Sequence, residues 1–139
     1  MRGKVFLDTN ILIYAIESAT YSDRRPQAAR NLIRRSTVTL STQVLGEFYR
    51  ATTSKRRQIP LTHDEAVAWI QLWKRHEIAT INTPHVDLAL ELTARYGIGY
   101  FDALILSTAQ LASCEITYSE DLNHGQCYDG VTVINPFIA

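Results

Sequence analysis

Short apolar runs alternate with segments of helical periodicity along the whole chain, and this alternation constrains the fold more than any other feature. The runs with strand character cover residues 5–7, 38–40, 77–81, 116–118 and 131–134. Helical patterns lie between them, over about 10–17, 24–35, 42–53, 62–73, 83–96 and 101–111. Strands separated by helices are typical of a parallel sheet with helices on both faces. We therefore predict an α/β three-layer sandwich, with a parallel sheet of about five strands, in a single domain over residues 1–139.

Local signals at several predicted helix ends support these boundaries. Ser41 or Thr42 can cap the helix that follows the second strand. Thr62 and Glu65 have the spacing of a capping box, which opens the next helix. Gly97 is suited to end the helix that begins near residue 83. The elements are therefore bounded by residues whose chemistry fits each boundary.

The two signs of charge are separated along the sequence, although 14 basic and 14 acidic side chains give the 139-residue chain a formal net charge of zero. Residues 1–75 hold 13 basic and 6 acidic side chains, a balance of +7, and residues 76–139 hold 1 and 8, a balance of −7. Nine of the basic residues lie between Arg24 and Arg57, where Glu47 is the single acid. This asymmetry indicates a polyanionic partner such as nucleic acid, although solvated helix faces would give the same pattern.

The sequence also indicates the cellular location of the protein. No apolar run approaches the ~18 residues that span a bilayer, and the first residues do not form a secretory signal. The two cysteines, Cys114 and Cys127, are too few for a disulfide framework and suit reduced thiols. We expect a cytoplasmic protein with no membrane segment.

Three aspartates stand where an α/β sheet commonly builds a site. Asp8 directly follows the first strand, and Asp121 follows the strand at 116–118 by a few residues. Asp102 opens the most apolar late helix. In open parallel sheets, ligands bind beyond the carboxyl ends of the strands. Each aspartate also has a purely structural interpretation, as a helix cap, a first-turn acid or a turn residue.

Glu47 is harder to explain by structure alone. It lies inside the predicted helix 42–53, among apolar neighbours that indicate burial, and a buried carboxylate needs partners. Gly46 precedes it, and because glycine costs about 1 kcal/mol in a helix interior we expect close packing there. The structural alternative is a local pair with Arg50, three residues further on.

The four acids together predict a cation site. Carboxylates gathered in one cleft repel each other, so they must protonate, separate or bind a cation. Oxygen ligands of this kind suit Mg²⁺ or Mn²⁺. Two such ions about 3.5–4 Å apart can activate water and stabilise the leaving oxygen in phosphodiester hydrolysis. The basic segment would then hold a nucleic-acid backbone beside the ions.

The ordered motifs of the chain resemble those of PIN domains. The motifs are VFLDTN at 5–10, Glu47, YFDA at 100–103 and YSEDL at 118–122. The tail over 121–137 is similar to the VapC toxin branch of that family. The resemblance covers essentially the whole chain.

This resemblance implies a metal-dependent ribonuclease that is the toxin of a type II toxin–antitoxin pair. It implies hydrolysis by a metal-activated water, which leaves a 5′-phosphate and a 3′-hydroxyl. It also implies a cognate antitoxin that blocks the acidic pocket, and a toxin homodimer. The RNA target, the number of metals and the need for the dimer stay open.

The resemblance further implies roles for individual residues. The acidic metal site would consist of Asp8, Glu47, Asp102 and Asp121. Supporting hydrogen bonds would come from Thr9, Asn10 and Ser119. Glu120 lies beside Asp121, and the Ser-x-Asp spacing favours Asp121 as the inward carboxylate. From the basic segment, the candidates for RNA contact are Arg24, Arg25, Arg50, Lys55, Arg56 and Arg57.

Other functional classes fit the sequence less well. A flavodoxin-like phosphoacceptor domain would need a late Lys, but no Lys or Arg follows Arg95. A haloacid-dehalogenase-type phosphatase would need Asp-x-Asp after the first strand, and Asn10 occupies the second position. A non-catalytic PIN-like binding module would be expected to lose one of the four acids. A solitary PIN-domain nuclease stays open.

Overall fold

A six-stranded, mostly parallel sheet forms the centre of the computed structural model, which describes residues 3–138. The ends of the predicted 1–139 domain therefore lie outside the described residues. The strands are β1 (Lys4–Leu7), β2 (Thr37–Ser41), β3 (Glu77–Ala79), β4 (Ile116–Tyr118), β5 (Cys127–Tyr128) and β6 (Val131–Ile134). Their order is β3-β2-β1-β4-β6-β5, and each adjacent pair is parallel except β5 with β6.

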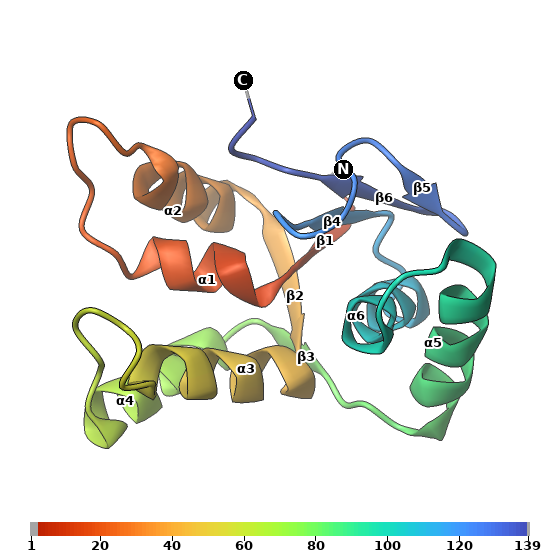
Figure 1. Ribbon diagram of the computed structural model, residues 1–139, viewed down its shortest axis with the longest axis horizontal. Helices are drawn as coiled ribbons and strands as arrows, with labels where there is room; N and C mark the ends of the chain where they lie inside the picture. The colour runs from red at the N-terminus through yellow and green to blue at the C-terminus, as the bar shows by residue number, and fades with distance from the viewer. Residues whose placement is uncertain (1–2, 139) are drawn as a thin grey trace.

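Helices follow the strands and flank the sheet, as Figure 1 shows. They are α1 (Thr9–Ala15), α2 (Arg25–Arg35), α3 (Thr42–Thr53), α4 (His63–Trp73), α5 (Thr83–Tyr96) and α6 (Tyr100–Leu111). Helix α1 packs against both α2 and α3, α3 packs against α4, and α5 packs along α6. The α/β fold with a parallel sheet flanked by helices is confirmed.

The local signals act as predicted. Ser41 caps α3, since its hydroxyl accepts a hydrogen bond from the backbone N–H of Val44 at 3.2 Å. Thr62 and Glu65 form the predicted capping box at the start of α4. Gly97 ends α5 in the left-handed region, with φ of 66°.

The β5 strand was not predicted. It has two residues and pairs antiparallel with β6 across a turn in which Asp129 and Gly130 both have positive φ, at 49° and 92°. A strand this short has no hydrophobic period to detect. It extends the sheet at one edge, away from the strands that carry the aspartates.

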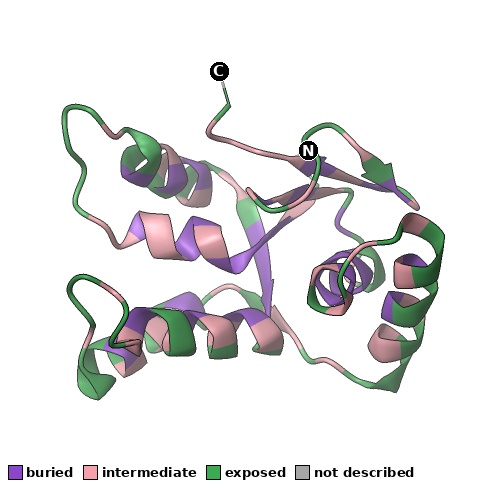
Figure 2. Cartoon of the chain, viewed as in Figure 1, coloured by how far each residue is buried: buried purple, intermediate pink, exposed green. Residues whose placement is uncertain are grey.

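The apolar core lies between the sheet and the helices, and Figure 2 shows β2 and the middle of α6 as largely buried. Trp73 of α4 is buried and packs edge-on against Phe48 of α3, with ring centroids 5.9 Å apart. Trp69 stacks on Trp73 at 5.5 Å, so this pair serves core packing. None of the helices in the described part of the chain is long and apolar enough to span a bilayer.

Candidate metal centre

The register of the sheet places Asp8 next to Ser119. Leu7 of β1 pairs with Tyr118 of β4, and the backbone N–H of Asp8 donates to the Tyr118 carbonyl at 3.0 Å. Asp8 is only 4% exposed, and its two oxygens accept hydrogen bonds of 2.7 Å from the Thr9 N–H and the Ser119 hydroxyl. Asp8 therefore caps α1 and also presents a fixed carboxylate at the carboxyl end of β1.

Three aspartates meet at this end of the sheet. One oxygen each of Asp8, Asp102 and Asp121 lies within 4.8 Å of the other two, and we call these three residues the acidic cluster. Asp102 reaches it from the first turn of α6. Asp121 is oriented by Asn10, whose Nδ2 donates to its Oδ2 at 3.1 Å, and by Ser119, whose Oγ accepts from its backbone N–H at 3.1 Å.

Glu47 faces the same cleft but lies outside the acidic cluster. Its Oε1 accepts a hydrogen bond of 2.6 Å from the Thr9 hydroxyl, and its Oε2 accepts one of 3.2 Å from Gln43 Nε2. Within residues 3–138, no ion pair joins it to Arg50. The structure thus brings three of the four predicted acids within reach of one ion and places the fourth beside them.

Gly46 does not have the predicted role. The residue is exposed, and a Cβ added there would meet nothing within 4 Å. The expectation of close packing at this position is wrong, and nothing in the structure explains the glycine.

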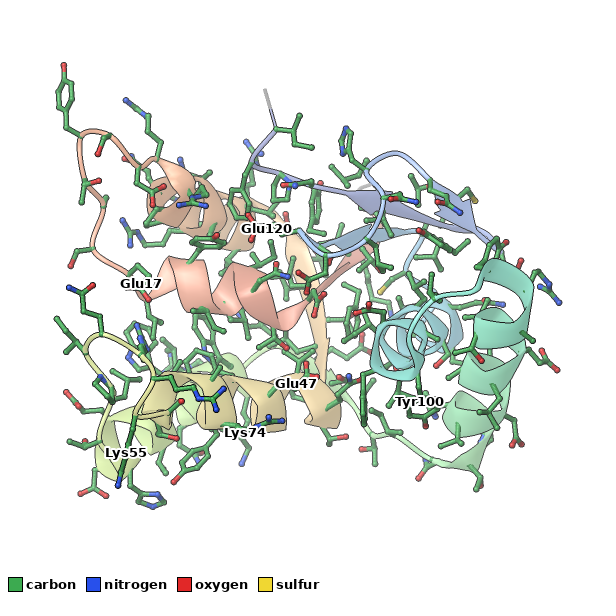
Figure 3. All side chains as sticks on the ribbon, in the orientation of Figure 1. Glu17, Glu47, Lys55, Lys74, Tyr100 and Glu120 are labelled. Atoms are coloured by element: carbon green, nitrogen blue, oxygen red, sulfur yellow. The ribbon has the colours of Figure 1, made fainter. Side chains whose placement is uncertain are left out.

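Glu120 points away from the acidic cluster. Both of its oxygens accept from the Tyr14 hydroxyl, at 3.0 and 3.2 Å, and Arg25 in turn donates to that hydroxyl at 3.0 Å. In Figure 3 Glu120 and Glu47 lie on opposite sides of α1. Of the two adjacent acids, Asp121 is therefore the one that faces inward.

The electrostatics of the acidic cluster favour a cation. Burial is the main cause that raises the pKa of Asp8 to about 7; the hydrogen bonds from Ser119 and Thr9 oppose the rise, and the charges of Asp121 and Glu47 add to it. Burial also raises the pKa of Asp102, with the same two acids adding to the effect. A divalent cation would relieve both the desolvation and the repulsion. The donor set, which is carboxylate oxygen only, fits Mg²⁺ or Mn²⁺.

A cleft of about 580 Å³ opens over the acidic cluster. It is lined by Asp8, Thr9, Asn10, Ile13, Glu47, Arg50, Ala51, Ser54, Phe101, Asp102, Ile105 and Asp121. The cleft thus runs from the carboxylates along one face of α3, where Arg50 places a positively charged side chain beside the acids.

The four predicted RNA-contact residues in and after α3 have different surroundings. Arg50 lines the cleft, while Lys55 and Arg56 are exposed in the loop after α3. Figure 3 shows Lys55 at the far end of α3 from Glu47. Arg57 forms an ion pair of 2.5 Å with Glu17 of the α1–α2 connection, and its side chain is only 17% exposed.

The two arginines at the start of α2 lie apart from the cleft. Arg24 and Arg25 line a separate surface cavity with Phe137 and Ile138. Arg25 forms an ion pair of 2.9 Å with Asp23. The structure therefore does not bring these two residues to the acidic cluster.

Gln43 contacts two residues that line the cleft, and the sequence interpretation missed it. Its amide donates to Glu47 and also to the backbone carbonyl of Phe101 at 3.2 Å. The available signal was its position four residues before Glu47, which places both side chains on one helix face.

Fold and site together define an α/β protein with an oxygen-only candidate metal centre at the carboxyl ends of parallel strands. The sequence matches the PIN domain family over residues 5–126, and the chain belongs to this family. No curated protein matches the sequence.

Solved structures share the fold at low identity, and VapC toxins are among these neighbours. A toxin–antitoxin complex from Klebsiella pneumoniae superposes with a TM-score of 0.71 at 18% identity, covering 96% of this chain and 98% of that one. VapC20 of Mycobacterium tuberculosis, a sarcin-ricin loop cleaving toxin, gives 0.64 at 20% identity, covering 84% and 91%. DNA-bound VapBC from Salmonella typhimurium gives 0.67 at 20% identity, covering 94% and 96%.

Proposed function

We propose that this protein is a metal-dependent endoribonuclease whose acidic cluster holds Mg²⁺ or Mn²⁺. The observation that carries the proposal is the approach of three aspartate oxygens to within 4.8 Å of one another at the floor of an open cleft. A bound divalent cation would supply a Lewis acid for the scissile phosphate and would lower the pKa of a water molecule. Membership of the PIN family supports the assignment.

The residues around the acidic cluster would keep its geometry ready for the cation. Ser119 and the Thr9 N–H hold the Asp8 carboxylate, and Asn10 holds Asp121. Glu47, fixed at both oxygens, lies close enough to accept a hydrogen bond from water in the cleft. Such preorganised ligands need little rearrangement when the ion and the phosphate arrive.

Single-stranded or looped RNA is the proposed substrate. The cleft is open, and Arg50 at its wall can pair with a backbone phosphate beside the acids. Exposed Lys55 and Arg56 extend the positive charge beyond the end of α3. A flexible strand can bring its scissile phosphate to a recessed site more easily than a duplex can. The expected products carry a 5′-phosphate and a 3′-hydroxyl.

Its proposed biological role is that of a toxin restrained by a cognate antitoxin, with a homodimer as the working form. Similarity of fold to toxin–antitoxin complexes and to a sarcin-ricin loop cleaving toxin supports this role. Expression of the chain alone should arrest bacterial growth, and expression of its Asp102→Ala variant should not. A neighbouring reading frame for a small DNA-binding antitoxin would support the toxin role, whereas its absence would favour a solitary nuclease.

The ribonuclease assignment is tested by incubating the purified chain with structured RNAs. We expect cleavage in Mg²⁺ or Mn²⁺, loss of cleavage in excess EDTA and recovery when Mn²⁺ is added back. Cleavage that persists in EDTA, or no cleavage of any RNA with either ion, would overturn the assignment.

A further inference from the structure

The first turn of α3 carries Gln43, whose side-chain amide contacts both walls of the cleft. Its Nε2 donates a hydrogen bond of 3.2 Å to Oε2 of Glu47, one helical turn further along the same face. The same nitrogen donates a second hydrogen bond, also of 3.2 Å, to the backbone carbonyl of Phe101 in α6. Since Phe101 directly precedes Asp102, one amide group connects the helix that carries Glu47 with the turn that carries Asp102.

The orientation of this amide is determined by its neighbours. A carboxylate oxygen and a backbone carbonyl only accept hydrogen bonds, so the NH₂ group of Gln43 must face them. Its Oε1 is then buried and has no hydrogen-bond partner among residues 3–138. A buried acceptor without a partner destabilises a fold, and native proteins keep few of them. Glutamine at this position leaves one of its own polar atoms without a hydrogen bond. Its value to the structure therefore lies in the two hydrogen bonds that its NH₂ group donates.

Glu47 is held by one donor at each of its two oxygens. The Thr9 hydroxyl donates to Oε1 at 2.6 Å from the start of α1, and Gln43 donates to Oε2 from α3. These bonds come from two different helices and fix the carboxylate beside the acidic cluster without bringing it into the cluster. Loss of the Gln43 donor would leave Glu47 free to turn about its last side-chain torsion.

We propose that Gln43 is a positioning residue that sets the separation of Glu47 and Asp102 across the cleft and thereby fixes where Glu47 lies relative to the cation held by the acidic cluster. This inference rests on the proposed function. Gln43 acts on the cation through the acids that it positions. Substitution of such outer-shell residues typically lowers metal affinity or activity by about 10–100-fold.

The proposal requires the full glutamine side chain. Asparagine is one methylene shorter, so its amide would not span both acceptors. Glutamate has no NH₂ group and would bring a negative charge against Glu47 and the Phe101 carbonyl. Methionine has similar length and volume but donates no hydrogen bond, which makes Gln43→Met the substitution that removes the two bonds most selectively.

The first test measures Mn²⁺ binding to the purified full-length chain by isothermal titration calorimetry at pH 8. Gln43→Met should weaken Mn²⁺ binding by about tenfold or more. Gln27→Met, at an exposed glutamine of α2, is the matched control and should bind Mn²⁺ within about twofold of wild type. In RNA cleavage with saturating Mn²⁺, Gln43→Met should lower kcat while KM for RNA stays within about twofold of wild type.

The second test asks whether Gln43 acts through Glu47. When Glu47 is replaced by Ala, adding Gln43→Met should weaken Mn²⁺ binding by no more than about threefold, because the carboxylate that it positions is gone. If Gln43→Met weakens Mn²⁺ binding equally in the wild-type protein and in the Glu47→Ala variant, the loss reflects general destabilisation, and the proposal is overturned. Gln43→Glu supplies a second single variant, which should also fold and lose affinity.

The outcomes separate this inference from the proposed function. Wild-type protein that binds Mn²⁺ and cleaves RNA, with a folded Gln43→Met variant of equal affinity and kcat, overturns the positioning role alone. If neither Gln43→Met nor Gln43→Glu shows a cooperative unfolding transition in EDTA, neither variant is folded. That result also overturns the positioning role, because a positioning residue is not required for folding. Wild-type protein that neither binds Mn²⁺ nor cleaves RNA overturns the proposed function itself.

Discussion

The hydroxyl of Ser119 donates a hydrogen bond of 2.7 Å to Oδ2 of Asp8, and it accepts one of 3.1 Å from the backbone N–H of Asp121. One oxygen therefore connects the buried carboxylate that caps α1 with the loop that carries a second acid. The contact follows from the register of the sheet, since Leu7 and Tyr118 are partners in adjacent parallel strands. The acidic cluster is thus built into the centre of the fold.

Removing this hydroxyl should destabilise the protein. Ser119→Ala leaves Oδ2 of Asp8 buried without its donor, which should lower the free energy of unfolding by about 1–3 kcal/mol. Urea denaturation at pH 8 in EDTA measures this change. Ser18→Ala, at an exposed serine, is the control and should change little. An unchanged midpoint and slope for Ser119→Ala would contradict the predicted role of the hydroxyl.

Without a divalent cation, stability should fall as pH rises from 5 to 8. The pKa of Asp8 is about 7 in the folded protein, against 3.8 for an aspartate free of such surroundings, so between these values the folded state binds the extra proton. A proton bound only by the folded state stabilises it, and that stabilisation is lost as pH rises through the folded pKa. Thermal unfolding in EDTA should show this decline for wild type and a smaller one for Asp8→Asn. Equal pH slopes for the two proteins would contradict the prediction.

A divalent cation should stabilise the folded protein, and more so at high pH. Mn²⁺ must displace the proton that Asp8 holds near neutrality, so its effect on Tm should be larger at pH 8 than at pH 6. An ion that binds only the folded state at about 100 times its Kd adds about 2.7 kcal/mol. Asp102→Asn should remove most of the Tm shift, whereas Asp87→Asn, at an acid of α5 outside the cluster, should keep it. A shift that survives in Asp102→Asn would place the ion elsewhere.

The division of the basic residues predicts unequal contributions to RNA binding. In an Asp102→Asn background, which should prevent cleavage, Arg50→Ala should weaken RNA binding and lower the magnitude of its salt slope by about 1. Arg24→Ala should have a smaller effect, because Arg24 lines a different cavity. Fluorescence anisotropy with a labelled single-stranded RNA at several salt concentrations measures both quantities. An equal or larger effect of Arg24→Ala would show that RNA takes another path.

Much of this architecture could be predicted because its determinants are local. Buried strands are apolar runs, and the capping box of Thr62 and Glu65 is a spacing visible in the sequence. The meeting of Asp8 and Asp121 could be predicted because parallel strands place their carboxyl ends at one edge of the sheet. Strand β5 could not, since two residues paired through a tight turn leave no periodic pattern.

Side-chain contacts that depend on how the helices pack could not be predicted. Arg57 looked equivalent to Arg50 in the sequence, but it pairs with Glu17, forty positions away, and only Arg50 lines the cleft. Gln43 had no charge or motif to distinguish it, and its role depends on the distance between α3 and α6. Such contacts depend on how helices pack, and hydrophobic periodicity does not specify that packing in detail.

The most direct test of the central claim is the initial rate of RNA cleavage at pH 8 in saturating Mn²⁺ for four proteins: wild type, Asp8→Asn, Asp102→Asn and the control Asp87→Asn. If the acidic cluster holds the catalytic ion, both cluster variants should lose at least about 100-fold in rate, and the control should match wild type. Cleavage by Asp8→Asn and Asp102→Asn at the wild-type rate would contradict the account.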